Sequence, residues 1–345
     1  MIRNTDKDLS TAEKVTQVVK RIIGQAWSET GDKIGGFAAS GEVPHRARRF
    51  SLAIDGVGSK LQIARLLGRH DTVGIDGVIM PAMDVYADGF IPHAVVDYFS
   101  TYKFNEQQIE QVLAGIVAGC QQLGCQLIGG ETAFHPELHR PTTYDLACAC
   151  LGFSTAQLRL DPRHRIRPGM TIWGWLSFGL GSNGYTFTRE SLGLAADISD
   201  DAKRAILQQK FPDLDDVLGN VLLRPTRQYL NELEAARQDG VKYEGLAHIT
   251  GDGLAKNLQR ILPPGCQAVV YRQSWERPPI FNLVEKLSGC SYQITDRHLN
   301  QGIQFISIVS GDKHPQDDNC VQIGEITERR EREPAVVMRG TYLDL

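Results

Sequence analysis

The sequence has 345 residues, 42% of them apolar, and its 37 basic and 41 acidic residues give a formal net charge of −4. This length suits two domains, and the charge balance excludes the broad basic surface that binds nucleic-acid phosphates. The N-terminal segment carries too many charges for a signal peptide, and no apolar run is long enough to span a bilayer. We therefore expect a cytoplasmic protein with neither a membrane nor a nucleic-acid partner.

Strands and helices of the first half are predicted from the spacing of apolar residues. A helix over residues 9–27 precedes a glycine-rich loop at 34–41. The elements predicted after this loop are a strand at 51–54, a helix ending at Leu67, a strand at 94–98, a helix at 106–123 and strands at 126–128 and 144–153. Because the strands are grouped and do not alternate strictly with helices, the pattern favours an α+β fold.

The second half begins with a polar, basic stretch at residues 155–170, which marks a connection between domains. The elements predicted beyond it are strands at 170–176, 267–271, 304–309 and 321–325, and helices at 184–193, 200–210, 226–238, 252–261 and 278–287. They form a second α+β unit. We divide the chain into an N-terminal helical segment (1–34), a first domain (35–155) and a second domain (165–335).

The first informative motif is Asp55-Gly-Val-Gly-Ser-Lys60, which follows a predicted strand. Its glycines let backbone amides approach a phosphate, Asp55 can hold a divalent cation, and Lys60 supplies a positive charge. The motif lacks the longer gap and the Gly-Lys-Ser/Thr ending of a Walker loop. Taken alone, it is also explained by a simple turn.

Further carboxylates follow this motif. Asp71, Asp76 and Asp84 come within the next segment, and Glu131 follows the Gly-Gly pair that ends the strand at 126–128. Several carboxylates near a phosphate-binding loop are what a magnesium-nucleotide site requires. Each one alone would also fit a helix cap or a solvated surface charge.

Two glycine-rich segments of the second half, residues 179–185 and 248–254, each precede a predicted helix and suit an anion. A different segment, His135-Pro-Glu-Leu-His139, spaces two histidines like metal ligands. Its proline and the position of its glutamate do not fit the zinc-protease pattern. The seven cysteines form no paired zinc signature, so we expect reduced and mostly buried thiols.

Together these segments resemble the aminoimidazole ribonucleotide synthetase family, the phosphoribosylformylglycinamidine cyclo-ligases, from about Ile34 to about Glu325. The resemblance rests on Asp-Gly-Val-Gly, Arg-His-Asp-Thr, Gly-Gly-Glu-Thr-Ala, Ser-Asn-Gly-Tyr, Pro-Thr and His-Ile-Thr-Gly in this order. It implies two α+β domains, with the first domains of two subunits pairing into a barrel in a homodimer. It also implies an ATP- and Mg²⁺-dependent ligase of de novo purine biosynthesis, which phosphorylates the amide oxygen of formylglycinamidine ribonucleotide and closes the imidazole ring.

The resemblance assigns roles to individual residues of this chain. The residues with catalytic roles would be Asp55, Lys60, Asp84 and Glu131, of which the three carboxylates would hold Mg²⁺. The residues that bind the nucleotide would be Gly56, Gly58, Lys60, Asp71 and Thr72. The residues that bind the substrate would be Ser182, Asn183, Gly184, Thr226, Thr250 and Asp252.

The sequence also departs from the family pattern. Gly181 stands where the family usually has a histidine, Met83 replaces an asparagine, Tyr102 and Asp252 each replace a glycine, and the N-terminal Tyr-Lys-Asp-Ala-Gly-Val segment has no clear counterpart. Several of these changes fall on the substrate side. Two alternatives to the cyclo-ligase therefore stay open, namely a paralogue that activates another amide or carboxyl substrate and a non-catalytic paralogue that binds a nucleotide or a partner enzyme.

Overall fold

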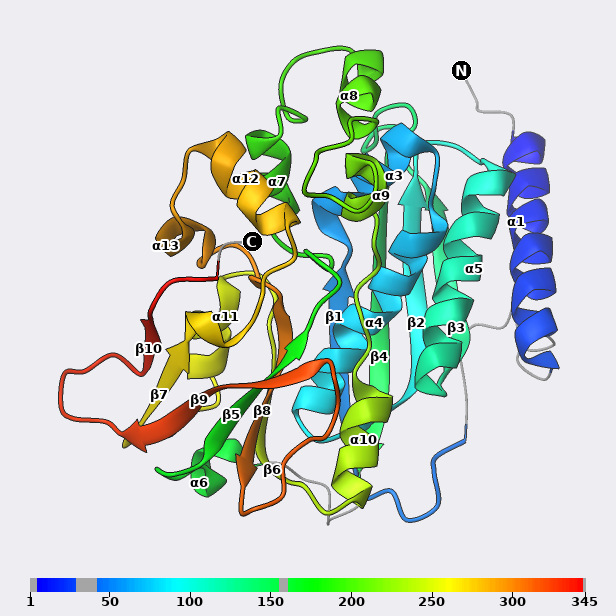
Figure 1. Ribbon diagram of the computed structural model, residues 1–345. Coiled ribbons are helices and arrows are strands. Elements are labelled where there is room, and N and C mark those ends of the chain that lie inside the picture. Colours follow the sequence, from blue (N-terminus) through cyan, green and yellow to red (C-terminus); the bar gives the residue numbers. More distant parts are fainter. Residues whose placement is uncertain (1–4, 29–41, 155–160, 344–345) are drawn as a thin grey trace. The chain divides into compact units, whose positions relative to one another are not determined.

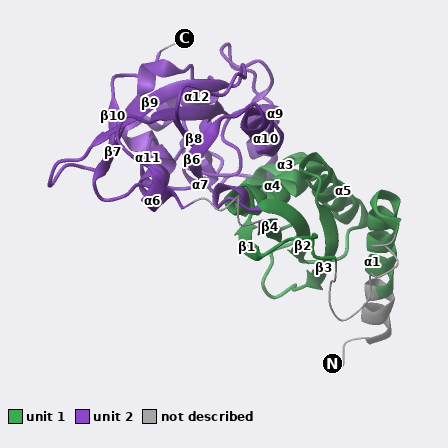
Figure 2. Cartoon of the chain, turned by 90° about the horizontal axis from the view of Figure 1, so that it is seen from below, with its two compact units in different colours: residues 1–85, 91–153 green, residues 86–90, 154–345 purple. Residues whose placement is uncertain are grey.

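The computed structural model describes residues 5–28, 42–154 and 161–343, so the glycine-rich loop predicted at 34–41 lies outside the described residues. The chain divides into two compact units (Figure 2). Unit 1 comprises residues 1–85 and 91–153, and unit 2 comprises residues 86–90 and 154–345. In the described part of the chain, no helix is both long and apolar enough to cross a membrane.

Unit 1 is a four-stranded sheet in the order β1-β4-β2-β3 with helices on one face (Figures 1 and 2). Strand β2 runs antiparallel to β4 and parallel to β3. The elements are α1 (Thr5–Ala26), β1 (Arg49–Gly56), a 3₁₀ turn (Gly58–Lys60), α3 (Leu61–Leu67), α4 (Asp71–Ala87), β2 (Ile91–Thr101), α5 (Glu106–Leu123), β3 (Gln126–Phe134) and β4 (Tyr144–Ser154). The predicted α+β character is confirmed for this unit.

Helix α5 follows its sequence signals closely. The Asn105 side chain accepts a hydrogen bond from the backbone N–H of Gln108, which caps the first turn, and Gly124 ends the helix in the left-handed conformation. Ile109 and Ile116, spaced for one face of a helix, are buried. The observed bounds therefore coincide with the predicted helix at 106–123.

Helix α4 is not predicted by the sequence pattern, because Gly74, Gly77 and Pro81 weaken its helical signal. The glycines are required by close packing. A Cβ on Gly74 would lie 2.2 Å from the carbonyl oxygen of Val112 in α5, and a Cβ on Gly115 would lie 1.8 Å from that of Asp71 in α4. The two helices therefore touch backbone to backbone.

Unit 2 is built on a six-stranded sheet in the order β10-β7-β9-β5-β8-β6 (Figure 1). Within this sheet, only the pairing of β10 with β7 is parallel among the described strands. The strands are β5 (Thr171–Leu176), β6 (Lys242–His248), β7 (Cys266–Tyr271), β8 (Ile303–Ser310), β9 (Cys320–Glu328) and β10 (Val336–Arg339). The mixed sheet and the helices beside it confirm the predicted α+β character of the second unit.

The helices of unit 2 mostly match the predicted segments. They are α6 (Pro162–Arg165), α7 (Tyr185–Ser191), α8 (Asp200–Leu207), α9 (Leu218–Leu222), α10 (Leu230–Gln238), α11 (Gly253–Gln259), α12 (Ile280–Ser288) and α13 (Tyr292–Thr295). Apolar side chains from the sheet and from α11 form a continuous buried core, with Ile306, Ile323 and Leu258 fully inaccessible. In the whole chain, the seven cysteines are free thiols and only Cys290 is not buried, as expected.

Candidate functional site

The Asp55–Lys60 motif forms a tight turn between β1 and α3. Half-buried Asp55 lies at the end of β1, where its Oδ1 accepts the backbone N–H of Gly56 at 2.7 Å. Gly58 adopts a left-handed φ of 68°, and nothing lies within 4 Å of the position that a Cβ would take there. The turn therefore leaves open space beside its backbone, as a phosphate-binding loop needs.

Lys60 lies in the interior of unit 1. Its Nζ is 2.7 Å from Oδ2 of Asp76 in α4, and both side chains are fully inaccessible. Burial lowers the pKa of the Lys60 ammonium, and the neighbouring Asp76 raises it in part. The sequence predicted both residues but not their pairing, and a contact between Lys60 and a nucleotide stays a prediction.

The remaining predicted nucleotide and metal residues lie on different elements of unit 1. Asp71 and Thr72 begin α4, half-buried Asp84 lies further along the same helix, and exposed Glu131 lies on β3. Among the described residues, no three His, Cys, Asp or Glu side chains gather into a metal site. Mg²⁺ usually binds one or two carboxylates and completes its shell with waters and substrate phosphates. The carboxylates have the right donor chemistry for such a shared ion, and their metal role stays a prediction.

Asp97 on β2 is an acidic residue of this region that the sequence analysis did not single out. It lies opposite Gly130 of β3, where a Cβ would come within 2.0 Å of Asp97 Oδ1. Burial raises the pKa of Asp97 to about 7, and the charge of Glu131 adds to the shift. The sequence signal that could have identified Asp97 was a carboxylate directly after the apolar run Ala94–Val96 of this strand.

His70, from the Arg-His-Asp-Thr motif, is a second buried group of unit 1. Its Nδ1 lies 2.8 Å from the hydroxyl of Tyr144, and its backbone N–H donates to the side chain of Gln111. Burial lowers the pKa of His70 to about 4, although the charge of Asp71 opposes the shift. His70 is therefore neutral at physiological pH and orients the start of α4 beside Asp71.

His135 and His139 converge on one hydroxyl. Ser100 Oγ lies 3.1 Å from Nδ1 of His135 and 2.8 Å from Nε2 of His139. These bonds tie the segment after β3 to the end of β2. The geometry explains both histidines as anchors of this segment.

The strand order of unit 2 brings its two glycine-rich segments to one edge of the sheet. Strands β5 and β6 flank β8, and both run antiparallel to it. Their carboxyl ends therefore meet at the start of β8, where Leu176 pairs with Ile303 and His248 with Phe305. The segments that follow β5 and β6 contain most of the predicted substrate residues, so the fold gathers residues that are some 70 positions apart.

The segment from Gly179 to Gly184 is held in place by Asn300. The Nδ2 of Asn300 donates to the carbonyl oxygens of Gly179 at 3.0 Å and Leu180 at 3.2 Å. Ser182 is buried, Asn183 is half-buried, and Gly184 adopts a left-handed φ of 73° just before α7. The predicted substrate residues of this segment thus lie on a fixed turn.

The other predicted substrate residues lie at two further turns of unit 2. Thr226 is buried ahead of α10. Thr250 and Asp252 lie in the turn between β6 and α11, where Asp252 has a left-handed φ of 71° and pairs with Lys256 at 2.7 Å on the surface. The Asp252 carboxylate is therefore partly neutralised by a lysine of its own helix.

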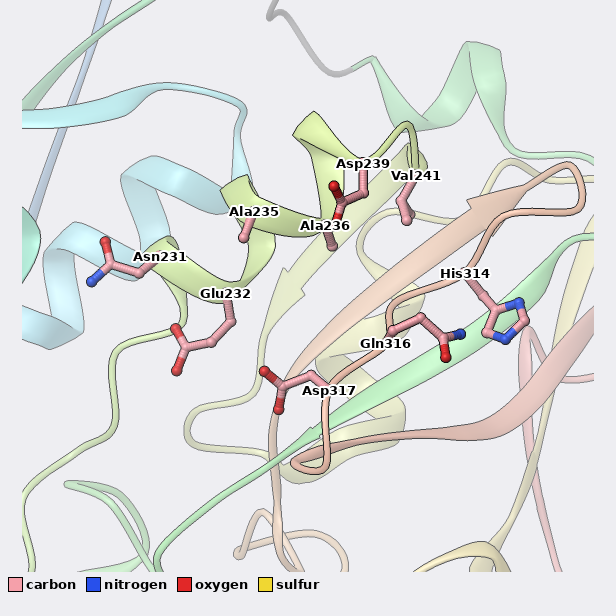
Figure 3. A pocket seen from close by; sticks show the side chains of 9 residues that line it. All are labelled: Asn231, Glu232, Ala235, Ala236, Asp239, Val241, His314, Gln316 and Asp317. Carbon is pink, nitrogen blue, oxygen red and sulfur yellow. The ribbon is translucent and has the colours of Figure 1, made fainter.

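A pocket of about 320 Å³ in unit 2 lies elsewhere (Figure 3). It is lined by Asn231, Glu232, Ala235, Ala236, Asp239, Val241, His314, Gln316 and Asp317. None of the predicted site residues lines it, and its carboxylates would repel a phosphate. The substrate site at the turns after β5 and β6 stays a prediction.

Comparisons with known proteins agree with these motifs. Family models described as AIR synthase related protein, N-terminal and C-terminal domains, match residues 40–154 and 167–336. A phosphoribosylformylglycinamidine cyclo-ligase of Syntrophotalea carbinolica is 34% identical over 96% of both chains, and one of Myxococcus xanthus is 41% identical over 74% of this chain and 72% of its own. The solved structure of hydrogenase maturation protein HypE in complex with ATP matches with a TM-score of 0.56 at 17% identity, covering 88% of this chain and 84% of that one. The chain belongs to the AIR synthase related family and, within it, to the phosphoribosylformylglycinamidine cyclo-ligases.

Proposed function

We propose that this protein is an ATP-dependent cyclo-ligase of purine biosynthesis that converts formylglycinamidine ribonucleotide into aminoimidazole ribonucleotide. The observation that carries the proposal is the full-length similarity to curated cyclo-ligases, 34% identity over 96% of both chains. The retained turns at Asp55–Lys60 and Gly179–Gly184 support it, because space is open beside Gly58 in the first turn and the second turn is rich in glycines with positive φ.

In the proposed reaction the amide oxygen of the substrate attacks the γ-phosphorus of ATP, and ADP leaves. A nitrogen of the same substrate then attacks the activated carbon, and phosphate leaves as the ring closes. Such chemistry depends mainly on positioning and on neutralising charge. Asp55, Asp84 and Glu131 would hold Mg²⁺, which would neutralise negative charge on the phosphates, and the glycines of the first turn would supply backbone donors.

The turns of unit 2 would hold the phosphoribosyl end of the substrate. Ser182, Asn183 and Gly184 lie on the turn that Asn300 fixes, so their positions are set before binding. Thr226 and Thr250 would add hydroxyl donors. The pairing of Asp252 with Lys256 reduces its repulsion of a substrate phosphate.

We also propose that the protein forms a homodimer through the open face of the unit 1 sheet. Phe50, Leu52 and Ile54 alternate along β1 and are 68%, 65% and 73% exposed, and Tyr98 of β2 is 41% exposed. A row of large apolar side chains on an edge strand is a typical interaction surface, since water contact with it is unfavourable. A second copy of the same sheet would cover it.

The proposed activity is tested by ADP release from MgATP with and without formylglycinamidine ribonucleotide. We expect release that depends on the ribonucleotide and that falls by about two orders of magnitude or more in Asp84→Asn, since the variant loses a charge at the phosphates. Asp88→Asn, the same change on an exposed aspartate beyond the end of α4, is the matched control. Folded protein without ribonucleotide-dependent release would favour the paralogue that activates another amide or carboxyl group.

A further inference from the structure

Gln304, at the start of β8, is a buried glutamine whose side chain makes no hydrogen bond to the part of the chain that the structure describes. It is 1% exposed, and neither Nε2 nor Oε1 has a hydrogen-bond partner among the described residues. A buried carboxamide normally finds partners for both atoms, because leaving them unpaired forfeits the hydrogen bonds they made with water. An unpaired one needs a reason.

The carboxamide lies against the substrate turn. A Cβ on Gly181 would lie 2.1 Å from Gln304 Nε2 and 3.0 Å from Oε1, so the side chain fills the space beside the Gly181 backbone. Gly181 also has a left-handed φ of 66°. The polar group beside this glycine is the carboxamide of Gln304.

Gln304 also contacts the second substrate turn. The backbone N–H of Ile249, which follows β6, donates to the carbonyl oxygen of Gln304 at 2.8 Å. One residue therefore touches both turns through different groups, its backbone at Ile249 and its side chain at Gly181. The unpaired atoms lie against the first turn, and the backbone of the same residue holds the start of the second.

Another buried glutamine of unit 2 shows what a structural role looks like. Gln267 on β7 is 7% exposed, and its Nε2 donates to the carbonyl oxygen of Pro334 at 2.8 Å, which ties β7 to the segment before β10. The side chain of Gln304 makes no such bond to the described residues. An apolar side chain of the same size would therefore stabilise the fold at least as well as Gln304 does.

We propose that Gln304 is a specificity-determining substrate residue, whose carboxamide hydrogen-bonds the sugar hydroxyls of a ribose 5-phosphate group held by the Gly179–Gly184 turn. The inference rests on the proposed cyclo-ligase function and names a contact within that site. A hydroxyl both donates and accepts, so a pair of them satisfies the amide N–H and the carbonyl together. A phosphate would satisfy only the N–H.

The test is Gln304→Met, which keeps the length of the side chain and removes both polar atoms. We expect the KM for formylglycinamidine ribonucleotide to rise about tenfold with kcat within a factor of about three, because the lost bonds serve binding. The melting temperature of the free enzyme should rise by about 2 to 4 °C, because a buried unpaired group is removed. Gln304→Ala, which adds no bulk near Gly181, should show the same increase in KM.

Gln267→Met is the matched control. It makes the same chemical change at a paired glutamine far along the sheet, so it should lower the melting temperature and leave KM unchanged. A wild-type KM in Gln304→Met and Gln304→Ala would overturn the inference and leave the cyclo-ligase function standing. A lower melting temperature with equal losses in all kinetic constants would show a structural role, which also overturns it. Wild-type enzyme without ribonucleotide-dependent turnover would instead reject the function itself, and the inference with it.

Discussion

Replacement of Lys60 by methionine should destabilise unit 1 strongly. The ammonium of Lys60 lies 2.7 Å from Asp76, and both side chains are fully inaccessible, so the variant leaves a buried carboxylate without its cation. Breaking a buried ion pair from one side costs about 3–5 kcal/mol. For a protein of this size that corresponds to a fall of roughly 6–20 °C in melting temperature, at about 2–4 °C per kcal/mol.

The assay is urea unfolding followed by circular dichroism, with calorimetry for the melting temperature. The double variant Lys60→Met/Asp76→Leu should recover most of the loss, since it removes the stranded charge as well. Lys103→Met, at an exposed lysine of the same unit, should stay within about 0.5 kcal/mol of wild type. If Lys60→Met were as stable as wild type and lost only ATP binding, the reasoning would be refuted and Lys60 would be a nucleotide ligand.

Three further predictions concern pH, strain and assembly. His70→Gln should remove part of the loss of stability on acidification, because the folded state keeps the His70 pKa at about 4 while the unfolded chain binds a proton near 6.5. The unfolded state thus binds more protons than the folded state between these pH values, so the free energy of unfolding rises with pH across this window. Urea unfolding of both proteins at pH 7 and pH 5 should show a smaller fall in the free energy of unfolding for the variant than for wild type. Asp252→Gly should stabilise the protein by up to about 1 kcal/mol in urea unfolding. A left-handed φ of 71° is strained for aspartate, and the surface ion pair of Asp252 with Lys256 contributes little to stability. A clear loss of stability in this variant would contradict the prediction. Ile54→Lys should convert a dimer to a monomer in light scattering after size exclusion, and an unchanged mass would reject the open sheet face as the interface.

Local sequence signals predicted much of the fold. Helix α5 was predicted to the residue because Asn105 caps it and Gly124 ends it. Helix α4 was missed because its glycines serve contacts with α5, which only the folded chain reveals. Strand β10 was missed because it is short and its partner β7 lies far away in the sequence, so only the folded chain reveals the pairing.

The candidate site was predicted in its motifs but not in its contacts. The order of glycine and carboxylate segments indicated the family, and the strand order of unit 2 explains how the turns at 179–184 and 249–252 come together. The pairing of Lys60 with Asp76 and the packing of Gln304 on Gly181 join residues that no motif connects. Side-chain pairing across the fold depends on tertiary structure, and the periodic spacing of apolar residues does not predict it.

The most direct measurement of the central claim is the identification of the product. The wild-type protein, incubated with MgATP and formylglycinamidine ribonucleotide, should yield aminoimidazole ribonucleotide, ADP and phosphate in equal amounts, detected by chromatography and mass spectrometry. Consumption of ATP without ring closure, or an unchanged ribonucleotide with a folded enzyme, would contradict the assignment as a cyclo-ligase.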